Sequence, residues 1–144
     1  MSTVHAVIGI SLLGANAVAA GWGGIAWLRK RPSVGFWYAL RVAQATVVVQ
    51  AIVGFLLFAQ GNRPADDLHV LYGIAPLFVS LFAEGMRAGA AQQVLAAVPD
   101  VEALSEDERR AVARDVVLRE MAVMTIGALL IVTLALRAIQ SGGL

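Results

Sequence analysis

The chain contains no cysteine, only two histidines and few charged side chains. The absence of cysteine excludes disulfides, thiolate metal sites, cysteine-ligated iron–sulfur clusters and thiol nucleophiles. Charged residues make up 15% of the chain and the net charge is +1, so no basic surface of the kind that nucleic acid needs is available. We therefore expect no nucleic-acid partner.

Sequence patterns of hydrolytic enzymes are missing as well. The chain has no glycine-rich phosphate loop, no zinc-protease helix motif, and no serine, histidine and carboxylate that would converge at one depth. An electron-transfer or accessory subunit is therefore favoured over a stand-alone enzyme.

Long apolar runs dominate what is present. Apolar residues make up 59% of the chain and the mean hydropathy is +0.76, whereas soluble domains contain about 45–50% apolar residues. A helix that crosses the ~30 Å hydrocarbon core of a membrane needs about 20 apolar residues. Four segments meet this requirement, namely residues 4–28, 36–58, 68–86 and 121–139. The sequence therefore predicts one all-α integral membrane domain over residues 1–144.

The first of these segments also has features of a signal peptide. However, it contains no basic residue before Arg29, and its apolar run continues to Trp27. Signal peptides have a basic start and a shorter apolar region. We therefore interpret residues 4–28 as the first membrane helix.

Basic residues are distributed unevenly between the two sides of the four segments. The first loop contains Arg29, Lys30 and Arg31, and the third segment is followed by Arg87, Arg109, Arg110, Arg114 and Arg119. The opposite side contains only Arg63 and Arg137. Cytoplasmic loops are enriched in Lys and Arg. We therefore expect a multi-pass protein of the cell membrane with both termini on the outer side.

Turn and capping signals define the connections between the segments. Pro64 ends the second helix, and Asp66 or Asp67 caps the third, so these two helices are predicted to be antiparallel neighbours. Together with the short first loop, this predicts a four-helix bundle of up-down-up-down topology.

The connection between the third and fourth segments is longer and more polar. Pro99 is predicted to stop the third helix at residue 98, and Ser105 with Glu108 forms a capping box for the fourth. The fourth helix can then run unbroken to residue 139. Residues 87–120 are therefore predicted to form a helical hairpin that extends the bundle on the cytoplasmic side.

The two histidines occur in the same short pattern, His-x-x-x-Gly, as His5 with Gly9 and His69 with Gly73. Each pattern lies near the start of a predicted helix, and in the predicted topology these two helices are parallel and diagonally opposed. A glycine one turn along the same face removes side-chain bulk where a flat macrocycle would lie. Two imidazoles at one depth provide the axial ligands of a b-type haem. The pattern predicts one haem b per chain, with both histidines as metal ligands near the outer face.

This arrangement is similar in general to the four-helix cores of membrane b-type cytochromes, whose histidines lie on parallel, diagonally placed helices. The resemblance covers only His5, Gly9, His69 and Gly73. Those families usually stack two haems and use four histidines, whereas this chain has one pair. A simpler alternative is that each histidine caps or hydrogen-bonds at its helix start without binding a ligand.

Three other residues are candidates for contact with the cofactor. Tyr72 lies one turn beyond His69 and is placed to pack near a cofactor edge. Arg63 and Arg137 are the outer cations available to haem propionates, a charge-assisted contact that arginine makes well.

Two charged side chains lie within the apolar segments, Arg41 in the second and Glu84 in the third. Counted inward from the outer loop at about 1.5 Å per residue, they reach similar depths near the inner interface. A paired arginine and glutamate can lock two antiparallel helices there. A proton path that includes Gln44 and Ser80 is the functional alternative. We predict a structural ion pair.

These features support two main hypotheses for function. The first is a small membrane b-type cytochrome that exchanges electrons with a quinone or an external redox protein. The second is a cofactor-free accessory or scaffold subunit of a larger membrane complex or homo-oligomer, suggested by the apolar residues of the hairpin. A carrier of ions or small molecules is disfavoured, because four spans leave little room for an alternating-access pathway.

Overall fold

The computed structural model describes residues 2–64 and 66–142, and these residues form four α-helices. The helices are α1 (Ser2–Leu28), α2 (Val34–Ala59), α3 (Asp67–Ala96) and α4 (Glu106–Gly142). Each contains a stretch long and apolar enough to span a membrane. The predicted all-helical architecture with four membrane-length segments is therefore confirmed.

The starts of three helices are fixed by capping side chains. The Ser33 hydroxyl accepts a hydrogen bond from Phe36 N at the start of α2, and the Asp66 carboxylate accepts one from Leu68 N at the start of α3. These bonds satisfy N–H groups that have no partner inside their own helix. The cap predicted at Asp66 is confirmed.

The predicted capping box is also present. The backbone N–H of Ser105 donates to Glu108 Oε2 at 2.8 Å, and Glu108 N donates to Ser105 Oγ at 3.4 Å. From this box α4 continues without interruption to Gly142. α3 ends at Ala96, two residues earlier than predicted, because Val98 N turns back to the carbonyl of Leu95 and Pro99 disfavours a helical conformation at Val98.

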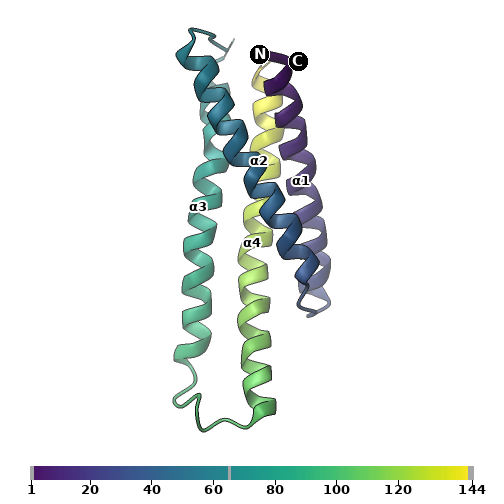
Figure 1. The fold of residues 1–144 in the computed structure, drawn as a ribbon, viewed down its shortest axis with the longest axis vertical. Coiled ribbons are helices and arrows are strands. Elements are labelled where there is room, and N and C mark those ends of the chain that lie inside the picture. Colours follow the sequence, from purple (N-terminus) through teal and green to yellow (C-terminus); the bar gives the residue numbers. More distant parts are fainter. Residues whose placement is uncertain (1, 65, 143–144) are drawn as a thin grey trace.

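The helices pack in a ring, with α1 against α2 and α4, and α4 also against α3 (Figure 1). α2 and α3 are in contact less extensively than the other neighbours. α1 and α3 therefore lie on one diagonal of the bundle. Both chain termini and the α2–α3 loop lie at one end, which we term the terminal end (Figure 1).

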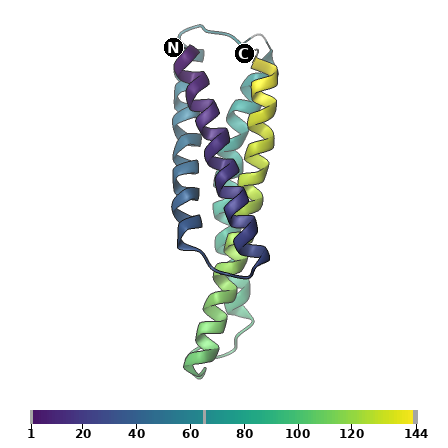
Figure 2. The ribbon, with the colours of Figure 1, turned by 90° about the vertical axis from the view of Figure 1, so that its right-hand side faces the viewer.

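The opposite end, which we term the hairpin end, is formed by α3 and α4 alone. Both helices continue well past the short connection between α1 and α2 (Figure 2). This projection corresponds to the helical extension predicted from the sequence. Only side chains at its base, such as Arg87 and Val117, reach α2 or the main core, so much of its surface is exposed.

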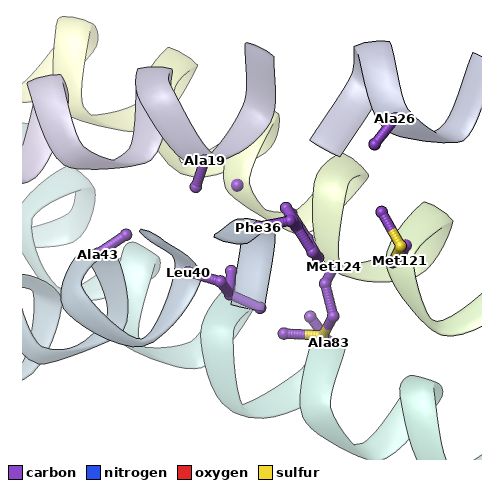
Figure 3. Close-up of a cluster of buried hydrophobic side chains, with 9 residues drawn as sticks. Ala19, Ala26, Phe36, Leu40, Ala43, Ala83, Met121 and Met124 are labelled. Atoms are coloured by element: carbon purple, nitrogen blue, oxygen red, sulfur yellow. The ribbon is translucent and has the colours of Figure 1, made fainter. Parts of the chain in front are cut away.

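The main core cluster is formed by side chains from all four helices (Figure 3). Five of its nine members are alanines, which allow the backbones to approach closely. The members are Ala19, Ala26, Ala43, Ala83, Ala128, Phe36, Leu40, Met121 and Met124. A second cluster nearer the terminal end contains Leu12, Val47, Ile131 and Ala135.

Gly23 is the point at which α1 comes closest to its neighbours. A β-carbon at this position would clash with Thr125 Oγ1 and with the ring of Phe36. A β-carbon at Gly21, two residues earlier, would have no atom within 4 Å and would face open space. The hydrogen side chain of Gly23 therefore determines how closely α1 packs on α2 and α4.

This contact gives a prediction for stability. Gly23→Ala should lower the free energy of unfolding by about 1–3 kcal/mol relative to Gly21→Ala, because overpacking costs that much. Both variants gain the same helix propensity, so their difference isolates the packing term. Thermal unfolding in mild detergent, followed by circular dichroism, measures it. Equal midpoints for the two variants would contradict the tight packing of α1 at Gly23.

Candidate functional site

The two histidines meet at the terminal end of the bundle. The ring centroids of His5 on α1 and His69 on α3 are 6.0 Å apart, and the ring planes are inclined by 60°. Both residues are half-buried. The structure thus brings together, across a diagonal, two side chains that are 64 positions apart in the sequence.

His69 is held by a backbone carbonyl of α4. Its Nδ1 lies 2.9 Å from the carbonyl oxygen of Ala138. A carbonyl oxygen only accepts, so the ring proton is on Nδ1 and Nε2 carries a free lone pair. Histidines that ligate metals are commonly oriented by the same kind of bond from the other ring nitrogen.

His5 is held by a side chain of α2. Gln50 Nε2 lies 3.2 Å from His5 Nε2. An amide nitrogen only donates, so His5 accepts at Nε2 and carries its proton on Nδ1. Among the described residues, neither His5 Nδ1 nor Gln50 Oε1 has a hydrogen-bond partner, although both atoms are buried. A buried polar atom without a hydrogen bond lowers the stability of a fold by about 1–3 kcal/mol. His5 Nδ1 and Gln50 Oε1 would therefore both be stabilised by a further polar partner.

Glycines surround the pair, but their roles differ from the prediction. A β-carbon at Gly54 on α2 would lie 3.3 Å from His5 Cε1, so this glycine makes room for the imidazole. A β-carbon at Gly9 would lie 3.1 Å from Gln50 Nε2. The space beside Gly9 is therefore filled by the glutamine side chain and is not open. Gly73, in contrast, has nothing within 4 Å of such an atom. Of the two predicted glycines, only Gly73 borders free space.

Tyr72 and Arg137 share a groove between α3 and α4, and His69 is not among its lining residues. The groove is open, has a volume of about 590 Å³, and is lined by Tyr72, Thr133, Leu134, Leu136, Arg137 and Gln140. Arg137 Nη1 donates to Gln140 Oε1 at 3.3 Å. Arg63 lies elsewhere, with its guanidinium carbon 3.9 Å from the centroid of the Phe58 ring. Two of the three predicted auxiliary residues are therefore together, and the third stacks on the end of α2.

A second polar cluster lies toward the hairpin end. Arg41 on α2 and Glu84 on α3 form the ion pair predicted from the sequence. Gln44 Nε2 donates to the same carboxylate oxygen at 2.8 Å, and Arg87 Nε donates to the other oxygen at 2.8 Å. Arg87 also contacts Glu120 on α4 at 3.4 Å. Two arginines and two glutamates thus connect three helices.

A small cavity with a mainly apolar lining adjoins this cluster. Its volume is about 10 Å³, close to the minimum for one water molecule. Asn16, Gln44 and Ser80 contribute its polar groups. Asn16 is only 1% exposed and donates from Nδ2 to Leu12 O at 2.9 Å. Gln44 and Ser80, the two residues considered for a proton path, therefore line one small cavity together with Asn16.

Several residues of these sites were missed by the sequence analysis. Gln50 is a single polar residue in an otherwise apolar stretch of α2, and such residues usually face the interior of a bundle. This signal was sufficient to predict that Gln50 faces the bundle interior, but not that it contacts His5. The contribution of Ala138 comes from its backbone, so no side-chain pattern can indicate it.

No protein-family model, curated protein or solved structure matches this chain. Within residues 2–64 and 66–142, no group of three or more His, Cys, Asp or Glu side chains is arranged to hold a metal ion. The interpretation of the site therefore depends on its geometry.

The ionic cluster gives a prediction for stability. Glu84→Gln should lower the free energy of unfolding by about 1–3 kcal/mol, between the values for exposed and buried ion pairs, because Arg41 and Arg87 lose their shared anion. Glu106→Gln is the matched control, because Glu106 pairs with Arg110 on the exposed hairpin. Unfolding in detergent measures both, and an equal effect of the two substitutions would contradict a stabilising role for the cluster.

The hydrogen bonds of the histidines give a second prediction. In haem-free protein above the titration range of the imidazoles, ¹⁵N NMR of labelled histidine should show His69 protonated on Nδ1. Gln50→Leu should shift His5 toward the Nε2-protonated tautomer and leave His69 unchanged, because only His5 loses its donor. Gln93→Leu, on the exposed hairpin, is the control. A His69 ring protonated on Nε2 would show that the bond to Ala138 is absent.

Proposed function

We propose that this protein is a small membrane b-type cytochrome in which His5 and His69 bind one haem. The observation that carries the proposal is the meeting of the only two histidines of the chain, whose ring centroids are 6.0 Å apart, with Nε2 of His69 left for a ligand. α1 and α3, which carry the two histidines, are diagonally opposed in the bundle. Other four-helix bundles also build cofactor sites in the core from side chains on facing helices.

The two imidazoles lie close enough that both could hold one haem, since their ring centroids are 6.0 Å apart. The bond from His69 Nδ1 to Ala138 leaves Nε2 available as a ligand. His5 can offer Nε2 when Gln50 releases it, and the unpartnered oxygen of Gln50 can then accept a hydrogen bond elsewhere. A haem held by two imidazoles supplies reversible one-electron transfer.

Other residues at the terminal end have roles in holding the cofactor. Gly73 leaves space beside His69, and Tyr72 with Arg137 lines the adjoining groove. Arg137 can pair with a propionate, whereas Arg63 would first have to leave the ring of Phe58. The groove thus offers polar contacts on the same two helices as His69 and its partner Ala138, and it opens to the surroundings.

The location of the histidines indicates how electrons are exchanged. With up-down-up-down topology and both termini outside, the pair lies close to the outer face of the cell membrane. One haem near one face cannot carry electrons across about 30 Å of hydrocarbon. We therefore propose exchange with a quinone or an external redox protein on the outer side, or with a partner subunit that supplies the next cofactor.

An accessory subunit without a cofactor is the second candidate. Leu95 and Val101 on the hairpin are 46% and 42% exposed, so apolar surface is available to another protein. This function predicts stable co-purification with a second chain and no visible absorption.

The haem content of purified variants tests the proposal. Protein expressed with a confirmed haem supply and purified in mild detergent should contain about one haem b per chain by the pyridine haemochrome assay. His5→Ala and His69→Ala should each remove most of it, because each deletes one axial ligand. Gln93→Ala on the hairpin should retain it. Circular dichroism separates loss of haem from loss of fold, and folded histidine variants with full haem content would refute the assignment.

A further inference from the structure

Four basic residues converge where α1 and α2 are joined. Arg29, Lys30 and Arg31 form the loop, and Arg114 Nη2 on α4 donates to Lys30 O at 2.7 Å. This bond holds the guanidinium group of Arg114 beside the backbone of the basic loop. We refer to these four residues as the basic collar.

The backbone of the collar is fixed by the end of α1. Arg31 N donates to Ala26 O and Lys30 N donates to Trp27 O, both at 2.9 Å. This pattern closes a helix through one residue in the left-handed conformation, usually glycine. Here that residue is Lys30, with φ of 50°. The three consecutive cations are therefore held on a defined turn rather than on a flexible loop.

The positive charge of the collar is not balanced by the protein. Within the described parts of the chain, no carboxylate lies within 4.0 Å of any of the four cations, whereas Arg87 and Arg110 elsewhere both form ion pairs. Asp115 is next to Arg114 in the sequence but does not pair with it. The charge of the collar is therefore available to an anion from outside the chain.

The surroundings of the collar indicate an amphiphilic anion. Leu28 and Val34, which flank the loop, are 79% and 71% exposed. Trp22 and Trp27 are 48% and 42% exposed on the last turns of α1, and the Trp22 indole N–H donates to Ser33 Oγ at 3.1 Å. Indole rings with a polar end are typical of the headgroup level of a membrane. Cations and exposed apolar side chains thus lie side by side at the end of two membrane-length helices.

We propose that the basic collar binds the phosphate of an anionic phospholipid, whose acyl chains lie along the exposed apolar ends of α1 and α2. Arginines on a fixed turn bind phosphate through charge-assisted hydrogen bonds. Basic sites between helices at the cytoplasmic side of a membrane recognise anionic headgroups in this way. The site lies at the opposite end of α1 from His5, and the proposal is independent of haem binding.

Native mass spectrometry of the full chain in detergent tests the site. The protein should retain added phosphatidylglycerol more strongly than phosphatidylcholine, and binding should weaken by about fivefold for each cation removed. The variants are Arg31→Gln, Arg114→Gln and the triple change of Arg29, Lys30 and Arg31 to Gln. Arg110→Gln is the matched control, because this arginine lies on the exposed hairpin and pairs with Glu106.

Three results would overturn the proposal. Equal binding of the two lipids would show that charge is not recognised. Unchanged phosphatidylglycerol binding in folded Arg31→Gln and Arg114→Gln would place the lipid elsewhere. Displacement of the lipid by inorganic phosphate at equal concentration would identify a site for free phosphate. The single variants keep the test valid if the triple variant does not fold.

Discussion

Polar side chains in long apolar helices must find their partners within the protein, because a membrane offers none. This constraint organises the structure. His5 is held by Gln50, His69 by a carbonyl of α4, and Glu84 by two arginines. Most polar groups are thus collected at a few points and most of the remaining inward surface packs as an apolar core, although Thr125 Oγ1 is buried beside Gly23 with no partner among the described residues.

The two polar clusters and the main core have different roles in the fold. The ionic cluster joins α2, α3 and α4 toward the end of the bundle where α1 ends and α2 begins, and the alanine-rich core brings all four helices close together. A β-carbon at Gly127 would lie 3.0 Å from Ala83 Cβ, which shows how closely α3 and α4 approach. The histidine pair differs from the ionic cluster, because among the described residues its buried atoms His5 Nδ1 and Gln50 Oε1 stay without partners. That difference is why we place ligand binding there and a structural role at the ionic cluster.

The number and approximate extent of the helices could be predicted from the sequence, because hydropathy, length and capping residues act locally. The Arg41–Glu84 pair could be predicted as well, because both residues are costly in lipid and lie at matching depths. The surroundings of the histidines were harder to predict. Gln50 and Gly54 come from α2, and their proximity to His5 depends on the rotation and crossing angle of that helix, which hydropathy does not encode. Gly9 was predicted to leave space for a macrocycle, but that space holds the side chain of Gln50. This difference also depends on how α2 is rotated, which hydropathy does not encode.

The central claim is that two imidazoles ligate one iron at the terminal end of the bundle. Electron paramagnetic resonance of the oxidised, haem-loaded protein tests this ligation most directly, because the spectrum reports the axial ligands of the iron. Ligation by both histidines predicts a single low-spin ferric species typical of two imidazole ligands. A high-spin ferric signal, which indicates that one axial position lacks an imidazole, would contradict it.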